Sequence, residues 1–185
     1  MGPGASVTSA LTQPRLLVPH HDLLAQRDLV PAVPGLYAWY FRVPPSAVPV
    51  SGCHRVGDST LLYVGIAPSR QPTEDTKRPS SLRGRVMTHA RRNASVSSEL
   101  GVALRRVGTR LHFGPGEAEL TAWLGENASV CWVEHVAPWM VEAEAISSLD
   151  LPLNLQHNRA HPFAPRLAEM RRVARVAARG DGEAV

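Results

Sequence analysis

Cysteine, lysine and long apolar runs are all scarce in this 185-residue chain. Its two cysteines, Cys53 and Cys131, lie far apart and belong to no CxxC motif, which excludes a disulfide framework and a zinc finger. No apolar run approaches the roughly 18–20 residues that a membrane-spanning helix needs. The first residues lack the basic start and apolar middle of a signal peptide, so we expect a cytoplasmic protein without a membrane partner.

Lysine is almost absent, because Lys77 is the only lysine and the other 19 basic residues are arginines. Seven arginines lie in 83–110 against one acid, and six lie in 159–179 against one acid. Residues 117–150, in contrast, hold seven acids and no basic residue. With a net charge of +4, this sorting fits a polyanion such as nucleic acid on two basic segments. A set of solvated helix faces explains it equally well.

The rest of the composition, 44% apolar and 19% charged, is typical of a globular chain of one domain. Apolar and aromatic runs predict strands at 35–41, 61–66 and 130–136. Helical patterns occur at about 20–27, 82–92, 98–107, 117–124, 140–149 and 165–178. Because strands and helices mix without regular alternation, we predict an α+β fold.

The domain organisation follows from changes in composition along the chain. Residues 1–14 are rich in Gly, Ser, Thr and Pro, and we expect them to form a disordered leader. Residues 15–162 are predicted to form one domain. Residues 163–185 are predicted to form a basic C-terminal helix and tail, which can contact a nucleic-acid backbone or simply face solvent.

All three tyrosines lie in the first two predicted strands. Alternation along a strand places Tyr37 on one face with Trp39, and Tyr40 on the other face. If the two strands pair as a hairpin, Tyr37 and Tyr63 can stand side by side. Ordinary aromatic packing accounts for the same pattern.

Two helices carry polar residues at unusual positions. On the helix at 82–92, Arg85, His89 and Arg92 follow one another at i, i+4 and i+7 and form one stripe, which can clamp a phosphate or face solvent. On the helix at 140–149, Glu142 lies about 40° from Ile146 around the axis and so belongs to the apolar side. A buried carboxylate must be paired, protonated or bound to a metal, which makes Glu142 the most unusual residue of the chain.

Five short motifs occur in a fixed order along the chain. They are Gly35-Leu36-Tyr37, Tyr63-Val64-Gly65, Leu82-Arg83-Gly84-Arg85 followed by His89, Glu142-Ala143-Glu144-Ala145-Ile146, and Pro152-Leu153-Asn154. Together they resemble the GIY-YIG nuclease family over residues 33–156. Two departures are a connection of 25 residues between the motif tyrosines, which is long for the family, and Ile66 where a basic residue is common.

The resemblance implies a small antiparallel sheet of about three strands flanked by helices, with extra helices at both termini. It implies hydrolysis of phosphodiester bonds assisted by Mg²⁺ or Mn²⁺, with Glu142 as the metal ligand. Tyr37 would activate water and pass a proton to His89, and Arg85 would stabilise charge on the phosphate. Tyr63 would orient water or phosphate, and Asn154 would position the helix end and the phosphate.

The resemblance also implies a nucleic-acid partner, with DNA favoured over RNA. We predict backbone contacts from arginines of the first basic segment, namely Arg83, Arg91, Arg92, Arg105 and Arg106. The alternative is a nuclease-like scaffold that binds nucleic acid without cutting it, although such a module has no need of a buried acid. His157 and His161 stand at the i, i+4 spacing of a zinc site, but without a third ligand nearby we interpret them as structural.

Overall fold

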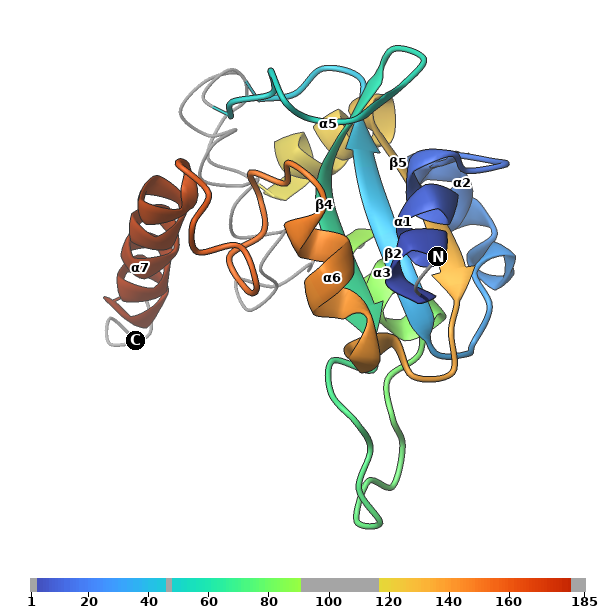
Figure 1. Ribbon diagram of the computed structural model, residues 1–185. Helices are drawn as coiled ribbons and strands as arrows, with labels where there is room; N and C mark the ends of the chain where they lie inside the picture. The colour runs from blue at the N-terminus through green and yellow to red at the C-terminus, as the bar shows by residue number, and fades with distance from the viewer. Residues whose placement is uncertain (1–2, 46–47, 91–116, 181–185) are drawn as a thin grey trace.

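A computed structural model describes residues 3–45, 48–90 and 117–180 of the chain (Figure 1). Its centre is an antiparallel sheet of five strands in the order β1-β5-β2-β4-β3. The three long strands are β2 (Gly35–Phe41), β4 (Ser59–Ala67) and β5 (Ala128–Glu134), and the two edge strands are β1 (Val18–Pro19) and β3 (Arg55–Val56). The predicted α+β class and antiparallel sheet are confirmed, but the prediction of about three strands missed the edge strands. Each has only two residues, too few to show a periodic pattern.

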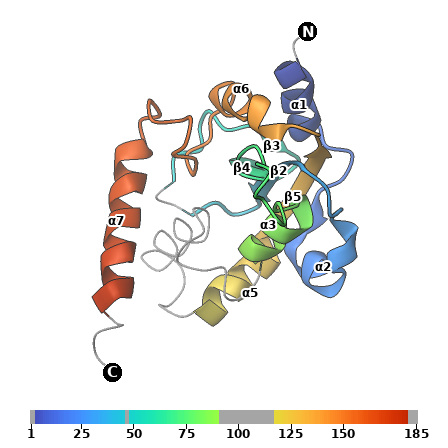
Figure 2. The ribbon, with the colours of Figure 1, turned by 90° about the horizontal axis from the view of Figure 1, so that it is seen from below.

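Helices cover both faces of the sheet, which therefore forms the middle of three layers (Figure 2). One face packs against α2 (His20–Ala25), α3 (Leu82–Ala90) and α5 (Glu117–Asn127). The helix α7 (Ala164–Gly180) stands beside the sheet (Figure 1), and its Leu167 and Met170 belong to the same core. The other face packs against α1 (Pro3–Thr12) and α6 (Glu142–Ser147). Short 3-10 turns, Arg27–Leu29 and Pro138–Met140, follow α2 and precede α6. The helix predicted at 98–107 lies outside the described residues.

Strand β2 is buried along its whole length because it lies between β4 and β5 and has helices on both faces. Tyr37, Trp39 and Phe41 belong to the core on the α3 side, whereas Tyr40 belongs to the core on the α1 side. The predicted alternation is therefore confirmed. The pairing of β2 with β4 shifts register between Trp39 and Tyr40.

The prediction of a disordered leader at 1–14 was wrong, because Pro3–Thr12 form the helix α1. Val7 and Leu11, one turn apart, are buried in the core that α1 shares with α6. The Tyr40 hydroxyl donates a hydrogen bond to the Leu11 carbonyl at 2.7 Å, which fixes the end of α1 on the sheet. Two apolar residues in a Gly- and Ser-rich stretch gave too weak a period to predict this helix.

The long connection between β2 and β4 packs onto the domain through its own apolar residues. Val48 and Cys53 are buried in the core on the α3 side. Both cysteines of the chain are free and buried, as expected. Within the described part of the chain, no helix combines the length and the apolar character that crossing a membrane requires.

Candidate active site

Tyr37 lies at the centre of a polar cluster beneath the sheet face that α3 covers. Tyr37 of β2 pairs with Gly65 of β4. A Cβ atom on Gly65 would lie 2.6 Å from Cζ of the Tyr37 ring. The missing side chain at Gly65 therefore makes room for the ring. Gly35 is needed in the same way, because its Cβ would collide with the Val133 carbonyl oxygen of β5. The two motif glycines thus have a packing explanation.

The polar stripe predicted on α3 faces the protein interior. The Leu82 amide donates to the Val33 carbonyl at 2.8 Å, which anchors the first turn beside β2. His89, two turns later, is only 3% exposed, and its Nε2 lies 2.8 Å from the Tyr37 hydroxyl. Arg85 is one turn before His89, and its buried Nε has no hydrogen-bond partner among the described residues. Two residues of the predicted stripe, Arg85 and His89, therefore interact with Tyr37. The third, Arg92, lies outside the described residues.

Burial and charge together set the protonation of this cluster. Burial raises the pKa of Tyr37 to about 12, although the charge of Arg85 and hydrogen bonds with Arg85 and Tyr63 oppose the rise. Burial, assisted by the charge of Arg85, lowers the pKa of His89 to about 3. At neutral pH both groups are uncharged. A neutral imidazole with a bare Nε2 can accept the Tyr37 proton, and this tautomer fits the short contact.

Tyr63 completes the aromatic part of the cluster from strand β4. Its ring centroid lies 6.3 Å from that of Tyr37 and 5.8 Å from that of His89. The predicted side-by-side arrangement of the two tyrosines is therefore what the structure has. Hydrogen bonding with Tyr63 lowers the pKa of Tyr37, so the Tyr63 hydroxyl stabilises charge that develops on the Tyr37 oxygen.

Glu142 enters the same cluster from the first turn of α6. It is 8% exposed, whereas Glu144 lies on the exposed side of the helix, beside Gly4 of α1. The helical phase predicted from Ile146 is thus correct. The charge of Glu142 raises the pKa of Tyr37, so the carboxylate lies within electrostatic range of the tyrosine. Tyrosines, arginine, histidine and glutamate from four different elements therefore converge.

The comparison with family models agrees with this convergence. A model described as the GIY-YIG catalytic domain matches residues 35–173, well over half of the chain. The chain belongs to the GIY-YIG family. The match extends from the first motif glycine into α7, and it supports a nuclease-type activity on nucleic acid. Neither the curated proteins nor the solved structures gave a match.

In this GIY-YIG domain Asn154 acts on the backbone of β4. Its Oδ1 accepts a hydrogen bond from the Val64 amide at 3.0 Å, and its Nδ2 donates to the Val64 carbonyl at 2.7 Å. The side chain is 3% exposed. Both ends of the amide are therefore engaged one residue from Tyr63, and the geometry identifies Asn154 as a positioning residue. The predicted contact with a phosphate stays a prediction.

The arginines predicted to bind nucleic acid are mostly beyond what the structure describes. Arg91, Arg92, Arg105 and Arg106 lie outside the described residues. Arg83 is described, and it is already engaged. Its Nη1 lies 2.9 Å from Asp28, and its Nε donates to the Val30 carbonyl at 2.8 Å. Arg83 therefore braces the 3-10 turn after α2, and its charge is partly neutralised.

One residue beside the site was not predicted. His157 has a backbone φ of 57°, and its Nε2 lies 3.6 Å from Oε2 of Glu142. His161, its supposed zinc partner, instead lies with Nε2 2.6 Å from Oδ1 of Asp150. The interpretation of the pair as something other than a zinc site agrees with this geometry, because the chain turns sharply at His157 and the two imidazoles approach different carboxylates. The only local signal of this contact is the left-handed backbone of His157, which the structure shows and the sequence does not.

The donor set of the site suits a hard divalent cation that keeps most of its water. Among the described residues, no group of three His, Cys, Asp or Glu side chains forms a complete protein cage. Mg²⁺ is commonly held by one or two carboxylates together with water and substrate phosphate oxygens. The single buried carboxylate of Glu142 fits this kind of site, and it does not fit a structural zinc centre.

Proposed function

We propose that this protein is a divalent-cation-dependent endonuclease that hydrolyses phosphodiester bonds, with DNA as the favoured substrate. The observation that supports it is the convergence of Tyr37, Tyr63, Arg85, His89 and Glu142 in one buried cluster. A module that only binds nucleic acid gains nothing from a carboxylate beside this cluster, because it would repel phosphate.

Tyr37 is the proposed general base. Its raised pKa means that the free site holds a protonated phenol at neutral pH, so it cannot act as a pre-formed tyrosinate. The short contact with His89 offers a relay: the Tyr37 oxygen takes a proton from the attacking water while its own proton moves to Nε2. Because both transfers can occur together, no free tyrosinate need accumulate.

The relay leaves a positive charge on His89, and the free site opposes that charge. Burial and Arg85 both lower the pKa of His89. A bound phosphate and the carboxylate of Glu142 bring negative charge that compensates for it. Proton transfer therefore becomes favourable only when substrate is present, which couples binding to chemistry.

Arg85 is the proposed phosphate-stabilising residue. Its buried Nε lacks a partner among the described residues, and an unsatisfied guanidinium donor is costly unless a ligand satisfies it. A phosphate oxygen is a suitable acceptor, since guanidinium and phosphate form strong charge-assisted hydrogen bonds. Charge that develops on the phosphate oxygens in the transition state strengthens such bonds.

Glu142 is the proposed ligand of Mg²⁺ or Mn²⁺. When bound, such a cation supplies a Lewis acid that polarises a phosphoryl oxygen. Glu142 itself holds the negative charge of the site and comes from the first turn of α6. Tyr63 orients the water or phosphate, and Asn154 keeps the Tyr63 strand in place.

The decisive experiment is incubation with single-stranded, duplex, branched and nicked DNA and RNA, in Mn²⁺ or in EDTA. We expect cleavage of DNA that EDTA abolishes. Glu142→Ala should abolish cleavage and weaken the binding of Mn²⁺ measured by isothermal titration, whereas Glu144→Ala should keep both. Glu144 is a matched control because it is an acid on the same helix but on its exposed side. Cleavage by Glu142→Ala would contradict the assignment, and binding without any cleavage would favour a non-catalytic module.

A further inference from the structure

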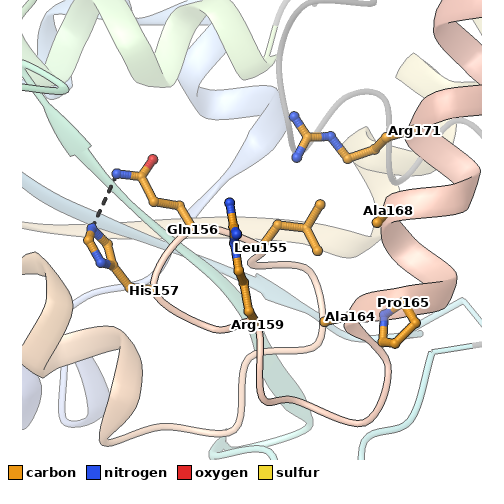
Figure 3. A pocket seen from close by; sticks show the side chains of 8 residues that line it. All are labelled: Leu155, Gln156, His157, Arg159, Ala164, Pro165, Ala168 and Arg171. Carbon is orange, nitrogen blue, oxygen red and sulfur yellow. Dashed lines mark hydrogen bonds between the residues drawn. The ribbon is translucent and has the colours of Figure 1, made fainter.

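A groove lies between the segment 155–159 and the helix α7, next to the proposed active site (Figure 3). Its volume is about 760 Å³. One wall comes from the segment and the other from α7, with Leu155, Gln156, His157, Arg159, Ala168 and Arg171 among the lining residues. We refer to this space as the α7 groove.

The α7 groove is connected through His157 to the proposed metal ligand, Glu142. His157 lines the groove, and its Nε2 lies 3.6 Å from Oε2 of Glu142. Gln156, beside it, approaches the same imidazole at 3.2 Å (Figure 3). Because His157 both lines the groove and contacts Glu142, a polymer bound at Glu142 can continue into the groove.

The described lining of the α7 groove carries positive charge. Arg159 extends from the segment and Arg171 from α7, and both guanidinium groups point into the space between the two walls (Figure 3). The described lining contains no carboxylate. Two arginines on opposite walls match the regular negative charge of a nucleic-acid backbone.

The sequence of α7 explains why one of its faces forms this wall. Leu167 and Met170 are buried and hold the helix on the core. Ala168 and Arg171, at the i, i+3 spacing, face the groove, and the small alanine leaves it open. Arg172 turns away and pairs with Glu169 on the exposed side at 2.7 Å. Arg171 and Arg172 thus lie on different sides of α7, and only Arg171 lines the groove.

We propose that the α7 groove binds the sugar–phosphate backbone of the DNA on one side of the scissile bond, with Arg159 and Arg171 each contacting a phosphate. This subsite rests on the proposed nuclease function and adds to it the path along which the substrate strand lies. The contacts are with phosphate and therefore independent of base sequence. Their role is to hold the strand so that the scissile phosphate reaches Arg85 and Glu142.

Salt dependence of binding gives a quantitative test. Each phosphate contact contributes about 0.9 to the slope of log K against log salt for duplex DNA. The double variant Arg159→Gln/Arg171→Gln of the full chain should therefore lower the slope by about 1.8, which is about a 60-fold loss of affinity at 0.1 M salt relative to 1 M. The measurement is fluorescence anisotropy of labelled duplex DNA in Ca²⁺, which suppresses turnover.

The matched control is Arg166→Gln/Arg172→Gln. It removes the same charge from the same region of the chain, but both arginines are exposed and neither lines the groove. We expect its slope to stay within about 0.5 of wild type, since only long-range charge is lost. An equal fall in both double variants would overturn the proposal in favour of general electrostatic attraction.

A chemical footprint places the DNA directly. Both native cysteines are buried, so Ala168→Cys introduces a single exposed thiol within the groove. Duplex DNA should slow alkylation of this thiol by maleimide, and it should not protect the thiol of Ser147→Cys on the exposed side of α6. Protection by a deoxynucleoside monophosphate but not by DNA would overturn the proposal and indicate a small anion.

The outcomes separate the groove from the nuclease function. If wild type cuts DNA but the groove variant binds with an unchanged slope and the thiol is not protected, the groove proposal is wrong and the nuclease function stands. If slope and footprint behave as expected but wild type cuts no nucleic acid, the groove is a binding surface and the hydrolytic function is wrong. If wild type neither binds nor cuts nucleic acid, both are wrong.

Discussion

Replacing Gly65 with alanine tests whether the packing of Tyr37 onto β4 controls catalysis. The new methyl group would lie 2.6 Å from Cζ of Tyr37, whereas carbon atoms prefer separations of about 3.5–4.0 Å. The ring must therefore move by about 1 Å. It has little room, because Tyr37 is 0% exposed and its hydroxyl is fixed 2.8 Å from His89.

The magnitude follows from two opposing effects. Overpacking of a buried site costs about 1–3 kcal/mol. Loss of the glycine's freedom in the unfolded chain returns about 0.4–1 kcal/mol. We expect Gly65→Ala to lower the free energy of unfolding by about 1–2 kcal/mol. Displacing a catalytic group by about 1 Å costs about 100-fold in rate, so cleavage should fall much more than stability does.

The measurements are urea denaturation and single-turnover cleavage of DNA. Gly84→Ala is the control, because Gly84 is an exposed position on α3 where a Cβ meets only Oγ of Ser81 at 3.6 Å. It should raise stability by about 0.5–1 kcal/mol and leave the rate unchanged.

A double-mutant cycle sharpens the test. In a Tyr37→Phe background the hydroxyl is absent, so Gly65→Ala should cost less stability than in wild type. If Gly65→Ala is as active and as stable as wild type, the close approach of Tyr37 to β4 has no part in catalysis, and our explanation of the second motif glycine fails.

Three further predictions concern single groups of the site. Tyr37→Phe should slow cleavage by about 10²–10⁴ while DNA affinity in Ca²⁺ is unchanged. Tyr40→Phe on the opposite face should leave the cleavage rate nearly unchanged, although it loses the hydrogen bond to Leu11, and a Tyr37→Phe protein that cuts normally would assign the base elsewhere. Asn154→Ala should cost about 2–4 kcal/mol in urea denaturation, because it leaves both backbone groups of Val64 unsatisfied, and a loss below about 0.5 kcal/mol would contradict the clamp. Because burial lowers the pKa of His89 from 6.5 to about 3, stability is full above pH 6.5 and should fall as the pH drops toward 3. The fall should be shallower in His89→Gln, where the lowered pKa of the buried His20 still contributes, and an equally steep fall in the variant would contradict the reasoning.

Short-range periodicity made part of the site predictable. The phase of α6 depends only on 100° per residue, so the offset of Glu142 from Ile146 was enough to bury Glu142 and expose Glu144. Alternation along β2 was enough to separate Tyr37 from Tyr40. These rules act within a few residues, and tertiary packing did not override them here.

Features that depend on one sharp turn or on distant packing were not predictable. His157 reaches Glu142 only because its backbone adopts a left-handed φ, and nothing in the residue type requires that. Helix α1 depends on two apolar side chains whose partners come from the other end of the chain. The ion pair of Arg83 with Asp28 could not be predicted for the same reason, since the two residues lie far apart in sequence.

The pair of hydrogen bonds between Asn154 and Val64 has a consequence for how this domain tolerates change. It fastens the segment after α6 directly onto β4, so the register between the glutamate and the second tyrosine does not depend on the loop that joins the two tyrosine strands. The exposed part of that connection, outside β3 and the buried Val48 and Cys53, can therefore lengthen without moving the chemistry. It offers a place where a substrate-reading module can be grafted into the middle of the domain rather than appended to its ends.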